Sequence, residues 1–323
     1  LPRSTYGVMD RFIANEFELY REKNIPLESR DTELRQKYQK IAGAMTATYD
    51  GREQTLQQLG KVLEETDRSR RQEVWELVAR RRLRDRDALE GLYDEMVKVR
   101  TAMARNAGFK NYRDYVFRAR GRFDYTPADC KAFLKACEKA VVPALRRRHE
   151  RRRKRMGVDV LRPWDLAVDP DGRPPLRPFR NAKELMDGCG RIFRKVHPDF
   201  GRMFDIIRAK GYLDLESRKG KAPGGYQTVF DVERLPFIFS NAVGRHDDVE
   251  TLLHEGGHSF HTFQCRHLDP IFCRSHPLEF AEVASMGMEL LGQPYLEEFY
   301  PKAEADRARA DHLEGLLSTY PWV

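Results

Sequence analysis

The segment 247–261 reads Asp247-Asp248-Val249-Glu250-Thr251-Leu252-Leu253-His254-Glu255-Gly256-Gly257-His258-Ser259-Phe260-His261. It contains the pattern H-E-x-x-H, and on a helix the two histidines, His254 and His258, stack on one face about 6 Å apart. Two neutral imidazoles in that arrangement can bind one zinc ion, while Glu255 lies beside the open coordination position. Chance alone would produce this pattern in such a chain with a probability on the order of one in a hundred. We therefore expect a zinc site at which Glu255 takes a proton from water.

The residues around this pattern favour a helix with one apolar face. Leu252, Leu253 and Phe260 supply that face, and the acidic residues before them suit the positive start of a helix. Gly256 and Gly257 oppose it, because each glycine inside a helix costs about 1 kcal/mol relative to alanine. We expect a neighbouring helix or strand to pack against their bare backbone.

A catalytic zinc site needs a third protein ligand, and the segment 277–289 offers three carboxylates on a predicted helix. Glu282 and Glu289 are seven residues apart and share a face, whereas Glu279 points about 60° away from Glu282. A carboxylate close to an apolar core requires a metal or another cation. At this point either Glu282 or Glu279 could complete the site.

Outward from this segment the chain is predicted to be mostly α-helical, with residues 1–156 almost entirely helical. Apolar residues at three- and four-residue spacing predict one long helix from Asp67 to about Gly108. Thr126-Pro127 predicts the start of another helix, which Pro143 should kink and which ends in the basic tract Arg146–Arg155.

The second half of the chain contains the predicted strands. Prolines between residues 161 and 178 predict a loop, and the next helix should be capped near Asn181. The short runs 228–232 and 235–239 predict a β-hairpin, with Pro236 confined to an edge or first position. We divide the chain into a helical N-terminal portion, 1–160, and a zinc-binding catalytic portion, 161–323.

Composition narrows the class of protein. The chain has 323 residues, a net charge of +8 and five scattered cysteines, without the spacing of a disulfide framework or a thiolate zinc site. No apolar run approaches the roughly 18 residues of a membrane span, so we expect a soluble, cytoplasmic protein without a membrane partner. The tract Arg146–Arg155 lacks interleaved aromatic residues, which favours a solvated helix end over a nucleic-acid site.

Several segments resemble one family of zinc metallopeptidases, that of thimet oligopeptidase and oligoendopeptidase F. The segment 251–261 looks like its extended H-E-x-G-H-S-x-H signature, and Phe280-Ala281-Glu282-Val283-Ala284-Ser285 resembles its downstream E-V-x-S element. The segments 211–226 and 105–115 are similar to further parts of the family. The resemblance covers the chain from about residue 70 to its end and is strong over residues 211–290.

The resemblance implies a mostly α, zincin-like helical metallopeptidase with a small β-hairpin or sheet beside the zinc-binding helix and a deep substrate channel. It implies that His254, His258 and Glu282 bind one Zn²⁺ ion per chain. Glu255 would be the general base and later the proton donor, and Glu289 would orient a ligand histidine. The implied function is a zinc-dependent endopeptidase, an oligopeptidase whose partners are short peptides and not nucleic acid.

Three further positions follow from the same resemblance. Ser285 has a counterpart in the family without a chemical role that we can assign, and His261 also matches the signature. The hairpin from Tyr226 to Asn241 could lend an edge to an extended peptide, because added strands bind through main-chain hydrogen bonds.

Two alternatives and one departure remain. Another H-E-x-x-H zinc peptidase would use Glu279 as third ligand. Fewer residues separate Glu279 than Glu282 from His258, and this shorter spacing in sequence is nearer that of other such enzymes. A helical nucleic-acid-binding or scaffold protein would use Arg146–Arg155. The family's later histidine and tyrosine loop, which supplies donors to the oxyanion, has no match here, so we expect a fragment lacking the C-terminal part, which binds zinc but hydrolyses peptides poorly.

Overall fold

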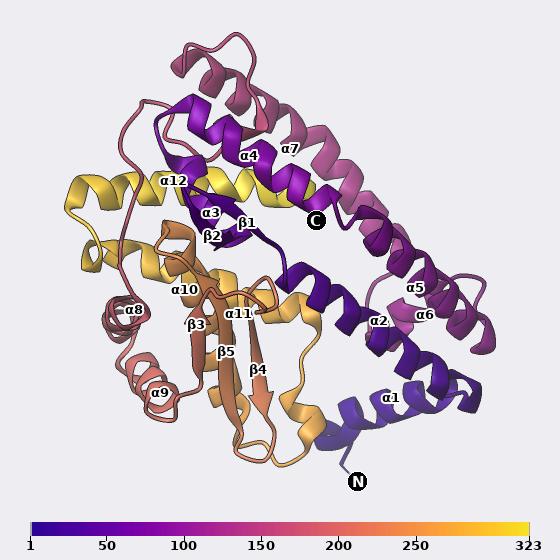
Figure 1. Ribbon diagram of the computed structural model, residues 1–323. Helices are drawn as coiled ribbons and strands as arrows, with labels where there is room; N and C mark the ends of the chain where they lie inside the picture. The colour runs from indigo at the N-terminus through magenta and orange to yellow at the C-terminus, as the bar shows by residue number, and fades with distance from the viewer. Residues whose placement is uncertain (1, 323) are drawn as a thin grey trace.

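The computed structural model describes residues 2–322 and is mostly helical, with two small sheets (Figure 1). The α-helices of the described chain are α1 (Arg3–Leu19), α2 (Ile25–Gly43), α3 (Leu56–Gly60), α4 (Arg68–Leu83), α5 (Arg86–Asn106), α6 (Tyr112–Ala119), α7 (Pro127–Arg155), α8 (Ala182–Val196), α9 (Pro198–Ala209), α10 (His246–Cys265), α11 (Leu278–Gly292) and α12 (Lys302–Trp322). Short 3-10 helices are η1 (Glu22–Asn24), η2 (Lys61–Glu64), η3 (Pro163–Asp165), η4 (Ile271–Arg274) and η5 (Gln293–Glu298). The predicted fold class, mostly α with a small sheet, is confirmed. No helix in this part of the chain combines the length and the apolar character needed to cross a membrane.

A hairpin interrupts the N-terminal helices, where the sequence analysis expected almost no strand. Strands β1 (Thr46–Tyr49) and β2 (Arg52–Thr55) pair antiparallel. Asp50 and Gly51 both have positive φ, 49° and 72°, as a tight two-residue hairpin turn requires. The sequence analysis did not predict this hairpin, although the Asp-Gly pair is a recognisable local signal for its turn.

The single long helix predicted from Asp67 to Gly108 is also wrong, because the chain turns at residues 84 and 85 and forms α4 and α5. The apolar residues of this stretch serve two different cores. Val74 in α4 packs with Leu59 and Val62, whereas Met103 in α5 packs with Leu19 and Tyr115. Periodicity alone cannot separate two helices whose apolar faces follow each other in sequence.

Helix α7 begins as predicted and continues through Pro143. Thr126 and Asp129 form a capping box at its start. At its C-terminal end Arg148 binds Glu314 of α12 at 2.8 Å, and Arg152 donates to the carbonyl oxygen of Asp165 at 2.8 Å. Part of the arginine tract therefore connects α7 to α12 and to the loop that follows α7. These contacts cross the predicted boundary between the two portions at residue 160, and that boundary stays a prediction.

The C-terminal sheet has the order β3-β5-β4, formed by β3 (Leu213–Glu216), β4 (Tyr226–Phe230) and β5 (Leu235–Ala242). The predicted hairpin is present as the antiparallel pair β4–β5, and β3 joins β5 in parallel. The expectation that Pro236 lies at an edge or first position was wrong, because it is the second residue of the central strand β5. It precedes Ile238, where the pairing with β3 begins. Its missing N–H therefore removes no hydrogen bond to β3.

The main core lies between this sheet and the helices α8, α9 and α10. Its fully buried side chains include Phe193, Phe204, Ile238, Leu252 and Leu253. Asn181 caps α8 as predicted, with its side chain accepting from the N–H of Glu184. Helix α10 packs against β5 and most extensively against α11, so the sheet and both helices meet at the segment that carries H-E-x-x-H.

The two glycines of α10 are explained by its neighbours. A Cβ on Gly257 would lie 2.4 Å from the carbonyl oxygen of Ala284 in α11, and a Cβ on Gly256 would lie 2.4 Å from the ring of Phe193. The expectation that neighbouring elements pack against the bare backbone is confirmed. Only glycine at position 257 lets the backbones of α10 and α11 approach this closely.

Candidate metal centre

Three side chains from α10 and α11 converge on one point. Oε2 of Glu282 lies 3.2 Å from Nε2 of His254 and 3.7 Å from Nε2 of His258. The three ligand atoms lie within 4.8 Å of one another, and among the described residues this is the group of histidine and carboxylate side chains able to hold a metal ion. Helix α10 supplies both histidines one turn apart, and the close approach at Gly257 brings α11 within reach.

These distances suit zinc. Ligand atoms at 2.0–2.2 Å around a tetrahedral zinc lie about 3.4 Å apart, close to the two separations from Glu282. With a neutral His254 the arrangement would be unfavourable in the absence of a cation, because the lone pair on Nε2 would face the lone pairs of a carboxylate. The donor set of two imidazoles and one carboxylate therefore fits a zinc ion that keeps an open position.

Glu289 fixes the orientation of His254. Its Oε1 lies 2.6 Å from Nδ1 of His254, and because a carboxylate only accepts, Nδ1 carries the proton. The lone pair is then on Nε2, the atom that faces Glu282. This hydrogen bond raises the pKa of His254 although burial acts to lower it, so metal binding there competes with a proton.

Glu279, the alternative third ligand, lies elsewhere. Its Oε1 accepts hydrogen bonds from Arg122 at 2.6 Å and from the hydroxyl of Tyr125 at 2.5 Å. It does not belong to the converging group of described side chains. The geometry thus supports Glu282, although both residues share α11.

Glu255 is buried beside the histidines, and its Oε2 has no hydrogen-bond partner among the described residues. Burial raises the pKa of Glu255 to about 7, a rise that His254 opposes and that Glu282 and Glu289 increase. Its Oε1 lies 3.6 Å from the position that a Cβ on Gly225 would occupy. Glycine in the loop before β4 therefore leaves room next to this carboxylate.

Ser285 makes a contact in this group that sequence reasoning did not explain. The side chain is fully buried, and its hydroxyl donates to Oε2 of Glu282 at 2.7 Å. It lies one turn beyond Glu282 on α11, so the signal available in the sequence was its spacing within E-V-x-S. His261 lies near a second histidine, His276, with ring centroids 4.4 Å apart.

The predicted substrate hairpin has two different ends. The ring of Tyr226 is half exposed and stacks on Phe239, with centroids 4.9 Å apart. Asn241 instead donates to the carbonyl oxygens of Ala222 and Gly224, both at 2.8 Å, and so holds the loop next to Glu255. Strand β4 is the edge of its sheet and is mostly exposed.

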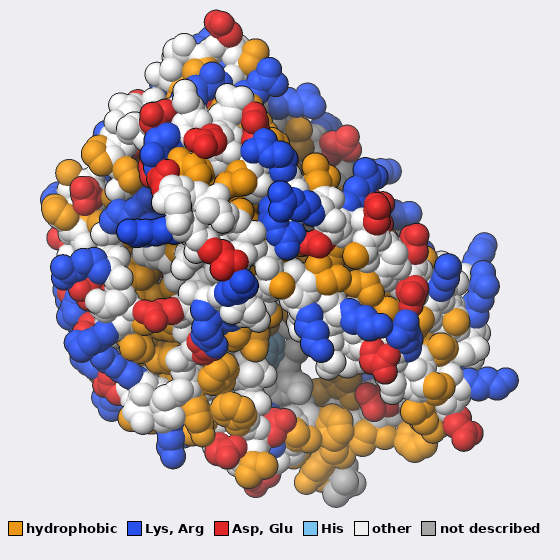
Figure 2. Space-filling model, viewed as in Figure 1, with side chains coloured by type: hydrophobic (Ala, Val, Ile, Leu, Met, Phe, Trp, Pro, Cys, Tyr) orange, Lys and Arg blue, Asp and Glu red, His pale blue; other side chains and the backbone are white. Residues whose placement is uncertain are grey.

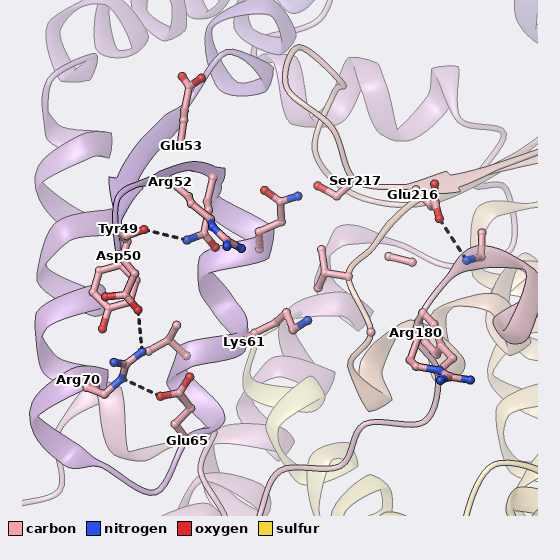
Figure 3. A pocket seen from close by; sticks show the side chains of 18 residues that line it. Tyr49, Asp50, Arg52, Glu53, Lys61, Glu65, Arg70, Arg180, Glu216 and Ser217 are labelled. Carbon is pink, nitrogen blue, oxygen red and sulfur yellow. Dashed lines mark hydrogen bonds and ion pairs between the residues drawn. The ribbon is translucent and has the colours of Figure 1, made fainter.

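Figure 2 shows the surface hollowed between the side of the sheet that carries β4 and the N-terminal helices α1 and α2. A different cavity, of about 620 Å³, lies where the β1–β2 hairpin meets the end of β3 and the start of α8 (Figure 3). Most of its charged groups are already paired, as Arg70 is with Asp50 and Glu65. It presents no converging set of metal ligands among the described residues.

Comparisons with known proteins show the family that the chain resembles. A model of peptidase family M3 matches residues 61–320. The chain is 29% identical over 163 residues to an oligoendopeptidase F homolog of Lactococcus lactis subsp. lactis (strain IL1403), a match covering 49% of this chain and 26% of that protein. The chain thus matches about a quarter of the length of this curated relative.

Solved structures extend the similarity over almost the whole chain. PZ peptidase A with an inhibitor superposes with a TM-score of 0.92 at 30% identity, covering 98% of this chain and 56% of that one. A chain described as an oligoendopeptidase F from Bacillus anthracis str. Ames gives 0.91 at 26% identity, covering 98% and 58%.

Proposed function

This chain belongs to peptidase family M3, and we propose that it carries the metal centre of a zinc endopeptidase that hydrolyses short peptides. The observation that supports this most directly is the convergence of His254, His258 and Glu282 next to Glu255, whose Oε2 is buried without a hydrogen-bond partner in the described part of the chain. Catalytic sites commonly combine such a ligand set with a carboxylate of raised pKa.

In this proposal His254, His258 and Glu282 hold one zinc ion. When bound, the metal would supply Lewis acidity, which lowers the pKa of water and polarises a peptide carbonyl. Glu289 keeps the proton of His254 on Nδ1 and thereby leaves Nε2 free as a ligand. Ser285 restricts the carboxylate of Glu282 to the rotamer that faces both histidines.

Glu255 performs the proton transfers. Its unpartnered Oε2 accepts a proton from the attacking water, and the same oxygen then donates that proton to the departing amine. Burial raises the pKa of Glu255 above that of an ordinary carboxylate, which makes it a stronger proton acceptor for this role. Burial excludes competing water from this carboxylate.

The substrate would bind as an extended peptide along β4. This strand pairs with β5 on one side, and no strand of the described chain covers its other edge. Main-chain hydrogen bonds to such an edge tolerate many side chains. The hollow beside it (Figure 2) favours short peptides over folded proteins, and a cytoplasmic location remains our expectation.

Two measurements test the proposal. Elemental analysis of the purified protein should find one zinc per chain, and a chain without bound metal after incubation with zinc would contradict it. Cleavage of an internally quenched peptide should be measured with the longest natural polypeptide that contains residues 1–323. Zinc-loaded material that cleaves no short peptide would refute the endopeptidase function while leaving the metal site intact.

A further inference from the structure

A row of polar residues, buried or partly buried, extends from the metal centre along α10 toward its N-terminus. His246, Glu250 and His254 lie at four-residue intervals and therefore share one face of the helix. Nε2 of His246 lies 3.4 Å from Oε1 of Glu250, and Nδ1 of His246 lies 2.9 Å from the hydroxyl of Tyr300. This row contacts residues of α11, α12 and the segment between them.

His312 of α12 connects this row to the residue that orients the metal ligand. The side chain is buried, with Nδ1 2.7 Å from Oε1 of Glu250 and Nε2 3.6 Å from Oε2 of Glu289. Nε2 has no hydrogen-bond partner among the described residues, so Glu289 is the acceptor it faces. The opposite oxygen of Glu289 receives the proton of His254.

The chemistry of His312 suits this place. Its two ring nitrogens each face a carboxylate, and an imidazolium donates from both. The hydrogen bond to Glu250 raises the pKa of His312, which favours this doubly protonated form. A cation between Glu250 and Glu289 also compensates for two carboxylates that lie in a largely buried region.

We propose that His312 is a positioning residue of the metal centre, acting through Glu289 on His254. Nε2 of His312 lies 3.6 Å from one oxygen of Glu289, and a charged His312 attracts that oxygen. This attraction favours the orientation in which the other oxygen of Glu289 faces Nδ1 of His254, so that Nε2 of His254 points toward Glu282. Helix α12 thereby becomes part of the support of a site formed by α10 and α11. The inference rests on the proposed function, since it requires a metal at this site.

The test uses two measurements on each variant. Competition with a chromophoric chelator gives the zinc affinity, and the absorption spectrum of the cobalt-substituted protein reports the geometry of the metal site. His312→Leu keeps most of the side-chain volume but removes both donors. Partners of metal ligands affect affinity by 10- to 100-fold, and we expect His312→Leu to weaken zinc binding about 10-fold and to change the cobalt spectrum. His312→Gln retains one donor and should fall between the Leu variant and the wild type.

The matched control separates this role from the docking of α12. Glu314→Gln removes the ion pair with Arg148 that attaches α12 to α7, and it should leave affinity and spectrum unchanged. A wild-type zinc affinity and cobalt spectrum in both His312 variants would overturn this inference without affecting the proposed function. If the Leu variant does not fold, wild-type values in the Gln variant would be enough to overturn it. A wild-type protein that binds no zinc would overturn the proposed function as well.

Discussion

The hydroxyl of Ser285 donates a hydrogen bond of 2.7 Å to Oε2 of Glu282, the oxygen that also faces both histidines. Because Ser285 is fully buried and one turn away on the same helix, it limits the rotamers of Glu282. A carboxylate that is already oriented loses less entropy when it binds a metal.

Ser285→Ala should therefore weaken zinc binding about 10-fold without loss of fold, in the range found for partners of metal ligands. Chelator competition measures the affinity. Ser240→Ala is the control, since it removes another buried hydroxyl, bonded to the carbonyl oxygen of Leu215 at 3.1 Å, away from the converging ligands. An equal effect of both changes would show that Ser285 acts only on stability.

The choice between the two candidate ligands on α11 gives a second prediction. Glu282→Ala should abolish tight zinc binding, because it removes one of three ligands. Glu279→Ala should leave the zinc content unchanged, because that carboxylate is bound to Arg122 and Tyr125. Measuring the zinc content of both variants distinguishes the two ligands. Loss of zinc in Glu279→Ala but not in Glu282→Ala would show that Glu279 is the ligand.

Glu255→Gln separates binding from chemistry. Glutamine has nearly the same shape but cannot accept the proton, so zinc content should stay at one per chain while turnover falls by about 10² or more. The rate is measured on the longest natural polypeptide that contains the chain. Turnover equal to that of the unaltered enzyme would show that another group is the base.

The sequence predicted those parts of the site that depend on local spacing. His254, Glu255 and His258 lie within one helical turn, and the helical period alone brings the two histidines together. Glu282 and Glu289 were separated from Glu279 by resemblance to a family, because helical angles left both third ligands open. The spacing within E-V-x-S places Ser285 one turn from Glu282, but the hydrogen bond between them also depends on the rotamers of both side chains, which the spacing does not determine.

His312 and the break between α4 and α5 were beyond sequence reasoning for a different reason. Both depend on which elements pack together across long separations in the chain. His312 faces Glu289 because α12 lies next to the row on α10. The β1–β2 hairpin was missed although its turn, Asp50-Gly51, had a recognisable residue pair.

Two glycines on the packed helices give a prediction about stability. A methyl group at Gly257 would lie 2.4 Å from the carbonyl oxygen of Ala284, whereas one at Gly287 would meet nothing within 4 Å. Gly257→Ala should lower the free energy of unfolding by about 1–3 kcal/mol, the usual cost of overpacking. Gly287→Ala should raise it by up to about 1 kcal/mol through helix propensity. Urea unfolding compares both, and equal shifts would contradict the close contact of α10 and α11.

The last prediction concerns the attachment of α4 to η3. Asp165 is fully buried and binds Arg68 at 2.8 Å and Arg71, itself almost fully buried, at 3.0 Å. Burial alone would raise the pKa of Asp165, but the hydrogen bonds from Arg68, the N–H of Arg162 and Arg71 outweigh it and lower the pKa to about 2.

A carboxylate whose folded pKa is depressed stabilises the fold above its unfolded pKa, and this contribution is lost as pH falls through the folded pKa. The contribution of Asp165 should therefore be complete near pH 5 and disappear toward pH 2, a change of about 2 kcal/mol. Asp165→Asn should remove this part of the acid dependence. It should also cost about 3–5 kcal/mol at neutral pH, because Arg71 stays buried without its counter-charge.

Urea unfolding between pH 2 and pH 7 measures both effects. Asp171→Asn is the control, since that carboxylate is half exposed in its pair with Arg155, and exposed ion pairs contribute little to stability. An unchanged acid dependence in Asp165→Asn would mean that the stabilising charge lies elsewhere, with Asp214, whose pKa is also lowered to about 2, the first residue to examine.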